Sequence, residues 1–352
     1  MIELKLTKDP APRIRALHGV NLAAPLSNAK VSHRVTEYLR PLHIPLTRMH
    51  DAPLDNPGMR LVDIPCVFPN ANADPSRPEN YYFDQTDDYF ANAWGYGTEI
   101  MYRLGVSIEL GAKHYWTQPP ADPDRRADIC LHIMAHYPRI EYWEIWNEAD
   151  VELPLLWDGT WSQFIDFYCR VATRLKAKFP DKKIGGPSMS SLKSGDGSYV
   201  RMFLDACRER NAPLDFFTYH QYSDKPEKVI VSPVQVRDLL DEFGFHATEL
   251  HLSEWHYHPG WGSDCDAARE GGVFAMMLGV DAAVYLCSVL SGWQSTPLTM
   301  GEYYTGSTGR GYALFDQSGE RTPGYYGMEF FQRLVAMPEG LAAESSDPAT
   351  QL

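Results

Sequence analysis

Short apolar runs recur along the chain and alternate with amphipathic stretches. Eight of these runs have the length and composition of buried strands. They are RALHGVNL (15–22), IPLTRMH (44–50), VSIELGA (106–112), EYWEIWN (141–147), KIGGPS (183–188), DFFTYHQY (215–222), ELHLSEW (249–255) and AAVYLCSV (282–289). Strands that alternate with helices in series favour a parallel sheet covered by those helices.

Two of the intervening stretches carry clear helix signals. Residues 160–179 space their apolar side chains three and four positions apart, and Thr160 with Gln163 predicts a capping box at the start. A Ser-Pro pair at 232–233 predicts the start of a second helix. Gly244 follows the last apolar position of that helix and is typical of a helix end.

Eight strand–helix units in series predict an α/β fold of the (β/α)8 type, a TIM barrel. We expect one domain over residues 1–352, with the barrel at roughly 14–340. An open doubly wound sheet is the alternative, but it would carry a glycine-rich phosphate turn after its first strand. The sequence there, HGVNLAAP, lacks the G-x-G-x-x-G pattern, so the barrel is favoured.

Two long segments show no periodicity, 51–85 and 291–322. They follow the second and the eighth predicted strands. The loops that follow the strands of such a barrel form its catalytic face. Long loops at this position are commonly functional, so we expect both to be walls of a substrate site.

Charge narrows the range of partners. Acidic residues outnumber basic residues by 46 to 32, which gives a net charge of −14. This disfavours nucleic acid and anionic membrane surfaces as partners, because both attract basic protein surface. A neutral partner such as a carbohydrate is compatible with it, as is a homo-oligomer.

The cellular location and the redox state of the cysteines are predicted from local sequence features. The N-terminal MIELKLTKDP has no apolar signal core, and no apolar run is long enough to cross a membrane. We therefore expect a cytoplasmic protein. The six cysteines form no C-x-x-C pair and are predicted to be free, mostly buried thiols.

Two glutamates end predicted strands in a way that suits glycoside hydrolysis. This reaction needs one carboxyl group that protonates the departing oxygen and a second that attacks the anomeric carbon or activates water. Glu148 closes the fourth strand in WEIWNEAD (143–150), and Glu254 closes the seventh in ELHLSEWHYHP (249–259). Strands four and seven face each other across a barrel mouth. We therefore predict a separation of about 5–5.5 Å, the spacing of retaining enzymes.

At these residues the sequence resembles the clan A glycoside hydrolases. WEIWNEAD is similar to the fourth-strand Asn-Glu motif of that clan, and LSEW to its seventh-strand nucleophile motif. More specifically, the chain resembles glycoside hydrolase family 39, the family of β-xylosidases and α-L-iduronidase. Further similar segments are RMH (48–50), IELGAK (108–113) and PLDFFTYHQYS (213–223), and the likeness covers roughly residues 14–335.

The resemblance implies a role for each matching position. Glu148 is the implied acid/base and Glu254 the nucleophile, with Arg48 holding Glu254 ionised from below. The implied sugar-binding residues are Asn147 for the 2-hydroxyl, His50 for another hydroxyl, His220 and Tyr222 for the same subsite, and Trp293 as the floor under the ring. Trp116, in an aromatic loop, is a further substrate-binding candidate. Tyr222 is also expected to hydrogen-bond the nucleophile.

Other chemistries are disfavoured. The cluster of His251, His256 and His258 invites a zinc hypothesis, but strand alternation directs His251 toward the helices, and no H-E-x-x-H or H-x-x-E-H occurs. We expect no metal and no cofactor. The serines at 188–191 lack a G-x-S-x-G elbow, which disfavours a serine hydrolase. Glu144 and Glu109 are predicted to be structural partners of basic residues.

The resulting expectation is a retaining β-glycosidase, with β-xylosidase as the activity that the resemblance favours. An endo-acting glycosidase is the alternative within the class, and a non-catalytic carbohydrate-binding barrel is the alternative from another class. Xylosidases of the family carry a β-sandwich domain after the barrel. Here only MIELKL (1–6) resembles a strand of such a domain, so we expect no complete sandwich.

Overall fold

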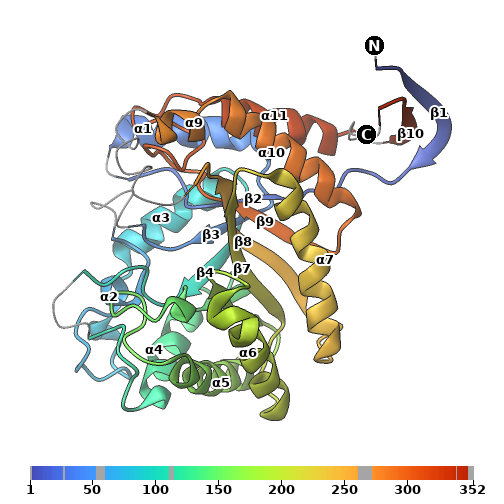
Figure 1. Cartoon of the computed structure of the whole chain (residues 1–352). Coiled ribbons are helices and arrows are strands. Elements are labelled where there is room, and N and C mark those ends of the chain that lie inside the picture. Colours follow the sequence, from blue (N-terminus) through green and yellow to red (C-terminus); the bar gives the residue numbers. More distant parts are fainter. Residues whose placement is uncertain are drawn as a thin grey trace.

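A closed barrel of parallel strands forms the centre of the molecule (Figure 1). The computed structural model describes residues 2–26, 28–52, 60–110, 115–260, 272–337 and 339–347. Each barrel strand pairs in parallel with the next, and the last pairs with the first. The strands are β2 (His18–Asn21), β3 (Leu46–Met49), β4 (Glu99–Leu104), β5 (Tyr142–Ile145), β6 (Lys183–Met189), β7 (Phe216–Ser223), β8 (Glu249–Tyr257) and β9 (Met300–Tyr303).

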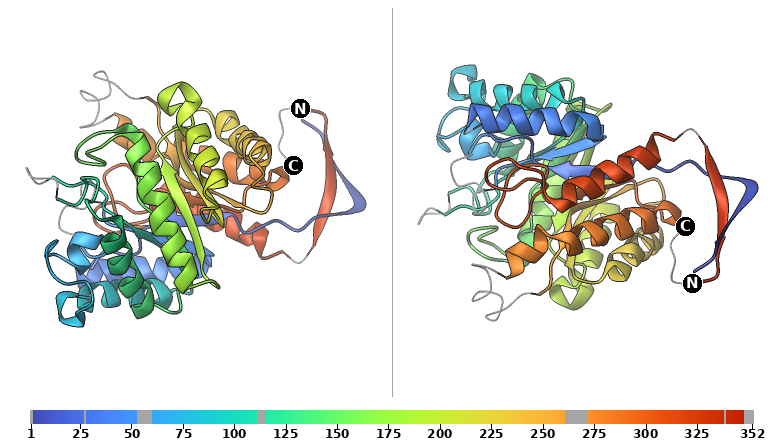
Figure 2. Two further views of the ribbon diagram at one scale, coloured as in Figure 1. Left: turned by 90° about the horizontal axis from the view of Figure 1, so that it is seen from below. Right: turned by 90° about the horizontal axis from the view of Figure 1, so that it is seen from above.

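Helices surround the barrel as an outer layer (Figure 2). They are α1 (Ala29–Leu39), α2 (Ile64–Val67), α3 (Asp84–Gly95), α4 (Pro123–His136), α5 (Trp161–Lys178), α6 (Ser198–Glu209), α7 (Pro226–Glu242), α9 (Val273–Met277), α10 (Val280–Gly292) and α11 (Pro323–Val335). Short 3-10 helices lie at Arg40–Leu42, Pro78–Asn80, Ala149–Val151, Ser194–Gly197 and Trp293–Ser295. The predicted (β/α)8 class is confirmed. Among the described residues, no helix has the length and hydrophobicity needed to cross a bilayer.

Six of the eight predicted strands match barrel strands, and two predictions are wrong. The third strand is Glu99–Leu104, and the predicted run at 106–112 lies after it, at the mouth, with 111–112 outside the described residues. The run at 282–289 belongs to helix α10, and the eighth strand is Met300–Tyr303. Helix α10 has one charged residue, Asp281, so its apolar run carried no helical period by which it could be told from a buried strand.

The two predicted helices are present, one of them with a different start. Helix α5 begins with the predicted capping box of Thr160 and Gln163. Helix α7 begins at Pro226, so Pro233 lies inside the helix. Proline has no backbone N–H and leaves the carbonyl four residues earlier without its helical partner. That carbonyl, on Val229, accepts a 3.0 Å hydrogen bond from the indole N–H of Trp293, which explains how the longer helix is stabilised.

Strand β8 contains an irregularity that matters for the site. Tyr219 of β7 pairs with Leu252, but the next residue, His220, pairs with Glu254. Ser253 is therefore the extra residue of a β-bulge. A bulge reverses the alternation of side chains beyond it, so His251 and Glu254 both point into the barrel. The prediction that His251 faces the helices is wrong for this reason, because its Nδ1 lies 2.8 Å from the buried Glu302 carboxylate of β9.

The barrel interior is filled in layers, as expected for this fold. The first layer, at the amino ends of the strands, is an apolar cluster of Leu46, Met101 and Phe216, with Tyr142 and Met300 packed against it. Above it lie ionic side chains, beginning with Arg48 and Glu144, which are both fully buried. The mouth lies at the carboxyl ends of the strands, where Glu148 follows β5 and Glu254 lies in the second half of β8.

A two-stranded antiparallel ribbon lies beside the barrel (Figure 2). It consists of β1 (Leu4–Ala11) and β10 (Gly340–Ser345), with Lys5 opposite Glu344. Strand β1 thus includes the second half of the predicted MIELKL segment, of which Met1 is outside the described residues. The cysteines Cys66, Cys130, Cys169, Cys207 and Cys287 are free, and Cys265 is outside the described residues.

Candidate active site

Glu148 is presented by a sharp turn of the backbone at the end of β5. Trp146 and Glu148 both adopt left-handed backbone conformations, with φ of 75° and 50°. Such conformations cost about 1–3 kcal/mol each for residues other than glycine and persist where the surroundings hold them. Here the Trp146 N–H donates to Leu104 O at 3.0 Å, and the Glu148 N–H donates to Ser188 O at 2.9 Å. The turn is thus tied to strands on both sides, and a quarter of the Glu148 side chain remains exposed.

Glu254 lies deeper, and both of its carboxylate oxygens are bound. Arg48 donates from Nη1 to Oε1 at 2.8 Å, and the Tyr222 hydroxyl donates to Oε2 at 2.8 Å. The side chain is 10% exposed. The cation and the phenol together thus fix the orientation of the Glu254 carboxylate.

Arg48 is the central connector of the site. Its guanidinium uses all five N–H donors. Nε donates to Glu144 at 2.6 Å, Nη1 to Asn21 and Glu254, and Nη2 to Asn147 at 2.8 Å and Ser188 at 2.9 Å. One buried cation therefore fixes the predicted nucleophile, the residue before the predicted acid, and Glu144. The prediction that Glu144 partners a basic residue is confirmed.

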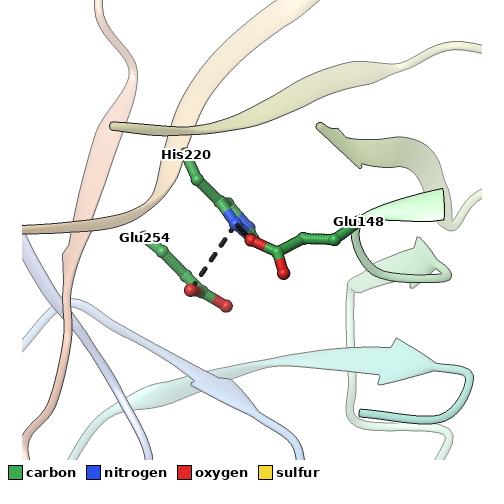
Figure 3. Close-up of side chains that lie close together, drawn as sticks. All are labelled: Glu148, His220 and Glu254. Carbon is green, nitrogen blue, oxygen red and sulfur yellow. Dashed lines mark hydrogen bonds and ion pairs between the residues drawn. The ribbon is translucent and has the colours of Figure 1, made fainter. Parts of the chain in front are cut away.

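His220 lies between the two glutamates (Figure 3). Its Nδ1 is 2.8 Å from Glu148 Oε1 and 3.5 Å from Glu254 Oε2, and its Nε2 is 2.7 Å from the Ser188 hydroxyl. The sequence did not single out Ser188 as part of this site. Its hydroxyl nevertheless joins His220 to Arg48 and Asn147.

The electrostatics favour an ionised Glu254. Burial raises the pKa of this carboxyl, but the charges of His220 and Arg48 and the hydrogen bonds from Tyr222 and Arg48 outweigh burial, so the pKa is lowered. Burial lowers the pKa of His220, and the charges of Glu254 and Glu148 reverse this effect, so its pKa is raised. The site thus favours an anionic Glu254 beside the buried Arg48 guanidinium.

The separation of the two carboxylates has the retaining form. Glu148, His220 and Glu254 each offer one atom, and these three atoms lie within 4.8 Å of one another. Inverting enzymes hold their carboxyl groups about 6.5–9.5 Å apart to leave space for a water, and retaining enzymes about 5–5.5 Å. The geometry therefore supports direct attack by one carboxylate and proton transfer by the other.

The same three side chains have the spacing of metal ligands. However, Arg48 is a buried fixed cation that already binds one oxygen of Glu254, and Tyr222 binds the other. A divalent ion placed between the carboxylates would meet the field of that guanidinium at short range. The arrangement suits an acid/nucleophile pair better than a metal centre.

The remaining predicted residues differ in how close they come to this pair. Asn147 is buried, and its Oδ1 accepts from Arg48, which fixes the orientation of its amide. Both ring nitrogens of His50 have protein partners, Asp51 O at 2.7 Å and Asn21 Oδ1 at 2.9 Å. A direct contact of His50 with a sugar hydroxyl stays a prediction.

The two predicted tryptophans are both enclosed by other parts of the protein. Trp293 is fully buried, ends α10 and packs edge-on against Trp255 with ring centroids 4.8 Å apart. Its prediction as the sugar floor is wrong, because it precedes the eighth strand rather than following it. Trp116 is also buried, with the Arg126 guanidinium 5.1 Å from its ring. The predicted substrate contact of Trp116 stays a prediction.

Glu109 has a structural role that goes beyond the predicted one. Its carboxylate accepts from the backbone N–H groups of Trp116 and Thr117, both at 2.9 Å, and so organises the loop after β4. Burial lowers the pKa of the nearby Arg126 guanidinium, and the charge of Glu109 opposes that shift. Glu109 therefore has a basic neighbour as predicted, and its hydrogen bonds in addition cap the loop.

Tyr304 is an aromatic residue of the site that sequence reasoning did not place. It follows directly after β9, and it is partly exposed. Its ring stacks on His50 at 6.0 Å and meets Tyr222 edge-on at 6.3 Å. Because Tyr222 binds Glu254, Tyr304 lies beside the nucleophile. The signal was present in the sequence, since Tyr304 follows a short strand, but the misplaced eighth strand concealed it.

A closed barrel with this carboxylate pair at the ends of β5 and β8 defines a class of protein, the glycoside hydrolases with a TIM barrel. Within that class, residues 137–243 match the family described as glycosyl hydrolases family 39. The match includes Glu148, His220 and Tyr222, and it ends before Glu254. The resemblance predicted from the sequence is thereby confirmed, and the chain is related to that family.

Individual relatives agree with this assignment. A β-xylosidase of Geobacillus stearothermophilus is 25% identical over 172 residues, which cover 40% of this chain and 33% of that protein. A β-xylosidase of Caldicellulosiruptor saccharolyticus is 24% identical over 99 residues, 27% of this chain and 19% of that protein. The similarity to these curated relatives therefore spans about a third of their length or less.

Solved structures establish the fold over nearly the whole chain. A glucosidase from Croceicoccus marinus superposes with a TM-score of 0.79 at 24% identity, covering 98% of this chain and 73% of that one. A β-xylosidase from Caulobacter crescentus gives a TM-score of 0.70 at 16% identity, covering 97% of this chain and 72% of that one.

Proposed function

We propose that the protein is a retaining glycoside hydrolase that cleaves β-glycosidic bonds by double displacement. The observation that carries the proposal is the close approach of Glu148 and Glu254, whose facing atoms lie within 4.8 Å. Glu254 is the nucleophile because it is bound by Arg48 and Tyr222 and its pKa is lowered, with burial opposing that shift. Glu148 is the acid/base because it is the more exposed of the two and faces the mouth.

The proposed reaction has two steps. Glu148 protonates the glycosidic oxygen while a Glu254 oxygen attacks the anomeric carbon, forming a covalent ester and releasing the leaving group. Once Glu254 is esterified, its negative charge is gone. Glu148, now deprotonated, removes a proton from water, which attacks the same carbon as the ester bond to Glu254 breaks. The sugar leaves with its original anomeric configuration, Glu254 is again a carboxylate, and Glu148 is again protonated.

The neighbouring residues support sugar binding in this scheme. Because Asn147 Oδ1 is held by Arg48, the amide N–H groups of Asn147 are the ones offered to the sugar 2-hydroxyl. A hydrogen bond there strengthens in the transition state. We assign the floor under the apolar face of the sugar ring to Tyr304 in place of Trp293, since Tyr304 is the partly exposed ring beside Tyr222.

A β-xyloside is the first substrate to test, because the two curated relatives are named β-xylosidases. The solved glucosidase gives a reason to include a β-glucoside. Turnover of 4-nitrophenyl β-xyloside, β-glucoside, β-galactoside and α-L-arabinoside would compare these sugars. Release of single sugars or of internal fragments from a xylo-oligosaccharide would distinguish exo-acting from endo-acting hydrolysis.

Three variants test the mechanism. Glu148→Ala is expected to lose hydrolysis of poor leaving groups and to regain activity with azide, giving a glycosyl azide with the configuration of the substrate. Glu254→Ala is expected to lose turnover, and azide attacking from the vacated side should give the inverted product. Glu152→Ala removes an exposed carboxylate of the same loop and should retain full activity. A wild-type protein that binds these sugars and hydrolyses none would instead be a carbohydrate-binding barrel.

A further inference from the structure

Asn21, the last residue of β2, makes four hydrogen bonds in the centre of the barrel and is fully buried. Its Nδ2 donates to the backbone carbonyls of Ser253 and Glu302, both at 2.8 Å. Its Oδ1 accepts from Arg48 Nη1 at 3.0 Å and lies 2.9 Å from His50 Nε2. A carboxamide has two donors and two acceptor sites, so all of its capacity is used.

The two carbonyls belong to strands β8 and β9, and one of them lies at the bulge. Ser253 is the extra residue of that bulge, since the pairing passes from Tyr219 and Leu252 directly to His220 and Glu254. The pairing of β8 with β9 shifts at the same place, between Leu252 and Trp255. The extra residue of a bulge falls outside the regular ladder. The Asn21 amide therefore supplies a hydrogen bond to the peptide where the ladder is interrupted.

The position of Glu254 depends on that interruption. In a regular strand, residues three apart point to opposite faces. His251 points into the barrel toward Glu302. Without the bulge Glu254 would therefore face the helices, and Arg48 and Tyr222 could not reach it. We propose that Asn21 is a positioning residue of the hydrolase, which aims Glu254 at the substrate by holding the Ser253 peptide and the Arg48 guanidinium in one arrangement.

This role is distinct from general stabilisation of the barrel. Asn21 touches neither of the two proposed catalytic carboxyl groups. It binds the peptide immediately before Glu254 and the cation that binds Glu254, so its loss should change the aim and the ionisation of the nucleophile together. A misplacement of about 1 Å can cost about a hundredfold in rate.

The inference rests on the proposed hydrolase activity, and it is tested on the intact chain with an aryl glycoside that the wild type hydrolyses. Asn21→Ala removes all four hydrogen bonds. Asn21→Asp keeps the shape and the acceptors but has no N–H for the two carbonyls. Both are expected to lower kcat about a hundredfold with KM changed less than about threefold. The acidic limb of kcat/KM should move to higher pH, because Glu254 is less well held by Arg48 and Tyr222.

Asn92→Ala is the matched control. The Asn92 amide donates to Ala24 O and Ser32 Oγ, both at 3.2 Å, and accepts from Thr36 at 2.6 Å, which joins α1 to α3 away from the site. It should lower the melting temperature and leave kcat and the pH profile of the folded enzyme unchanged. The rate of covalent trapping by a 2-deoxy-2-fluoro glycoside reports formation of the Glu254 ester and should fall in the Asn21 variants alone.

The possible outcomes separate the two hypotheses. If the wild type is inactive on every glycoside tested, the proposed function fails. If the wild type is active and both Asn21 variants keep its kcat, trapping rate and pH profile, the positioning role is overturned and the hydrolase stands. Should Asn21→Ala prove unstable, Asn21→Ser retains one donor and is expected to lose about tenfold in kcat, less than Asn21→Asp. An equal loss in the folded Asn92→Ala enzyme would also overturn the inference.

Discussion

Arg48 offers a sharp test of how the site is held together. Replacing it by Gln removes the charge and leaves at most two of five donors. The side chains of Glu144 and Glu254, which are 0% and 10% exposed, would then be buried without their cation. Removing one partner from a buried ion pair typically costs about 3–5 kcal/mol. We therefore expect the free energy of unfolding of Arg48→Gln at pH 7 to fall by about that amount.

The pH dependence of this loss has a defined sign. Burial raises the pKa of Glu254, but Arg48 helps to lower this pKa below its ordinary value of 4.5. A depressed carboxyl pKa contributes stability that is present above the unfolded pKa and is lost as the pH falls through the folded pKa. The stability gap between wild type and Arg48→Gln should therefore be largest at neutral pH and should narrow below about pH 4.5. In the same variant the acidic limb of kcat/KM should move to higher pH.

Urea denaturation followed by tryptophan fluorescence measures the free energy of unfolding. A pH–rate profile measures the acidic limb of kcat/KM, which reports the ionisation of Glu254. Adding Glu144→Gln to Arg48→Gln removes one of the two buried carboxylates that have lost their cation. The double variant should therefore regain part of the lost free energy of unfolding. Arg103→Gln is the matched control, because Arg103 is a buried partner of Asp63 that does not contact Glu254. It should destabilise the fold without moving the acidic limb. An Arg48→Gln protein within about 1 kcal/mol of wild type, with an unchanged profile, would refute the reasoning.

Three further outcomes follow from the site and the barrel. Tyr222→Phe removes the 2.8 Å donor to Glu254 and should lower kcat/KM about 10- to 100-fold in steady-state assays. Tyr304→Ala should raise KM for aryl glycosides while Tyr304→Trp keeps it near wild type, and equal KM values would exclude a role as sugar floor. Burial lowers the pKa of His251, but the charges of Glu302 and Glu249 and their hydrogen bonds together outweigh burial and raise it to about 9. This contribution to stability is therefore complete below pH 6.5 and lost as the pH rises through 9. Urea denaturation at pH 7 and pH 9.5 should show that loss in wild type and not in His251→Phe.

The sequence was sufficient for the architecture and for choosing two glutamates that the structure brings together. Six of the eight predicted strands were correct, and Glu148 and Glu254 each belong to a strong apolar segment whose motif resembles that of known hydrolases. Both signals are local, so neither requires knowledge of the packing. Helix α10 shows where a local signal is insufficient. Its apolar run 282–289 contains no charged residue that would reveal a helical period, so it could not be distinguished from a buried strand.

The misplaced Trp293 was a consequence of that helix. An aromatic residue after the eighth strand was the correct pattern, but the strand itself is the short segment Met300–Tyr303, so the residue that follows it is Tyr304. The role of Trp293 depends on a proline in another helix. Pro233 has no N–H to donate to the Val229 carbonyl, and the Trp293 indole N–H donates to that carbonyl instead. That pairing joins positions 64 residues apart and leaves no trace in either local sequence.

The features that make the site work are the places where the regular pattern of the chain is broken. Glu148 and Ser188 adopt left-handed backbone conformations, with φ of 50° and 57°, and Glu254 follows the bulge at Ser253. Period-two alternation cannot predict such positions, because a bulge reverses every side chain beyond it. A buried network centred on Arg48 and Asn21 contacts Ser188, Glu254 and the Ser253 peptide, and so joins these irregular segments. The nucleophile, its counter-ion and the bulged peptide are therefore expected to behave as one coupled unit, so that substitutions of Asn21 and Arg48 should combine non-additively in a double-mutant cycle on kcat.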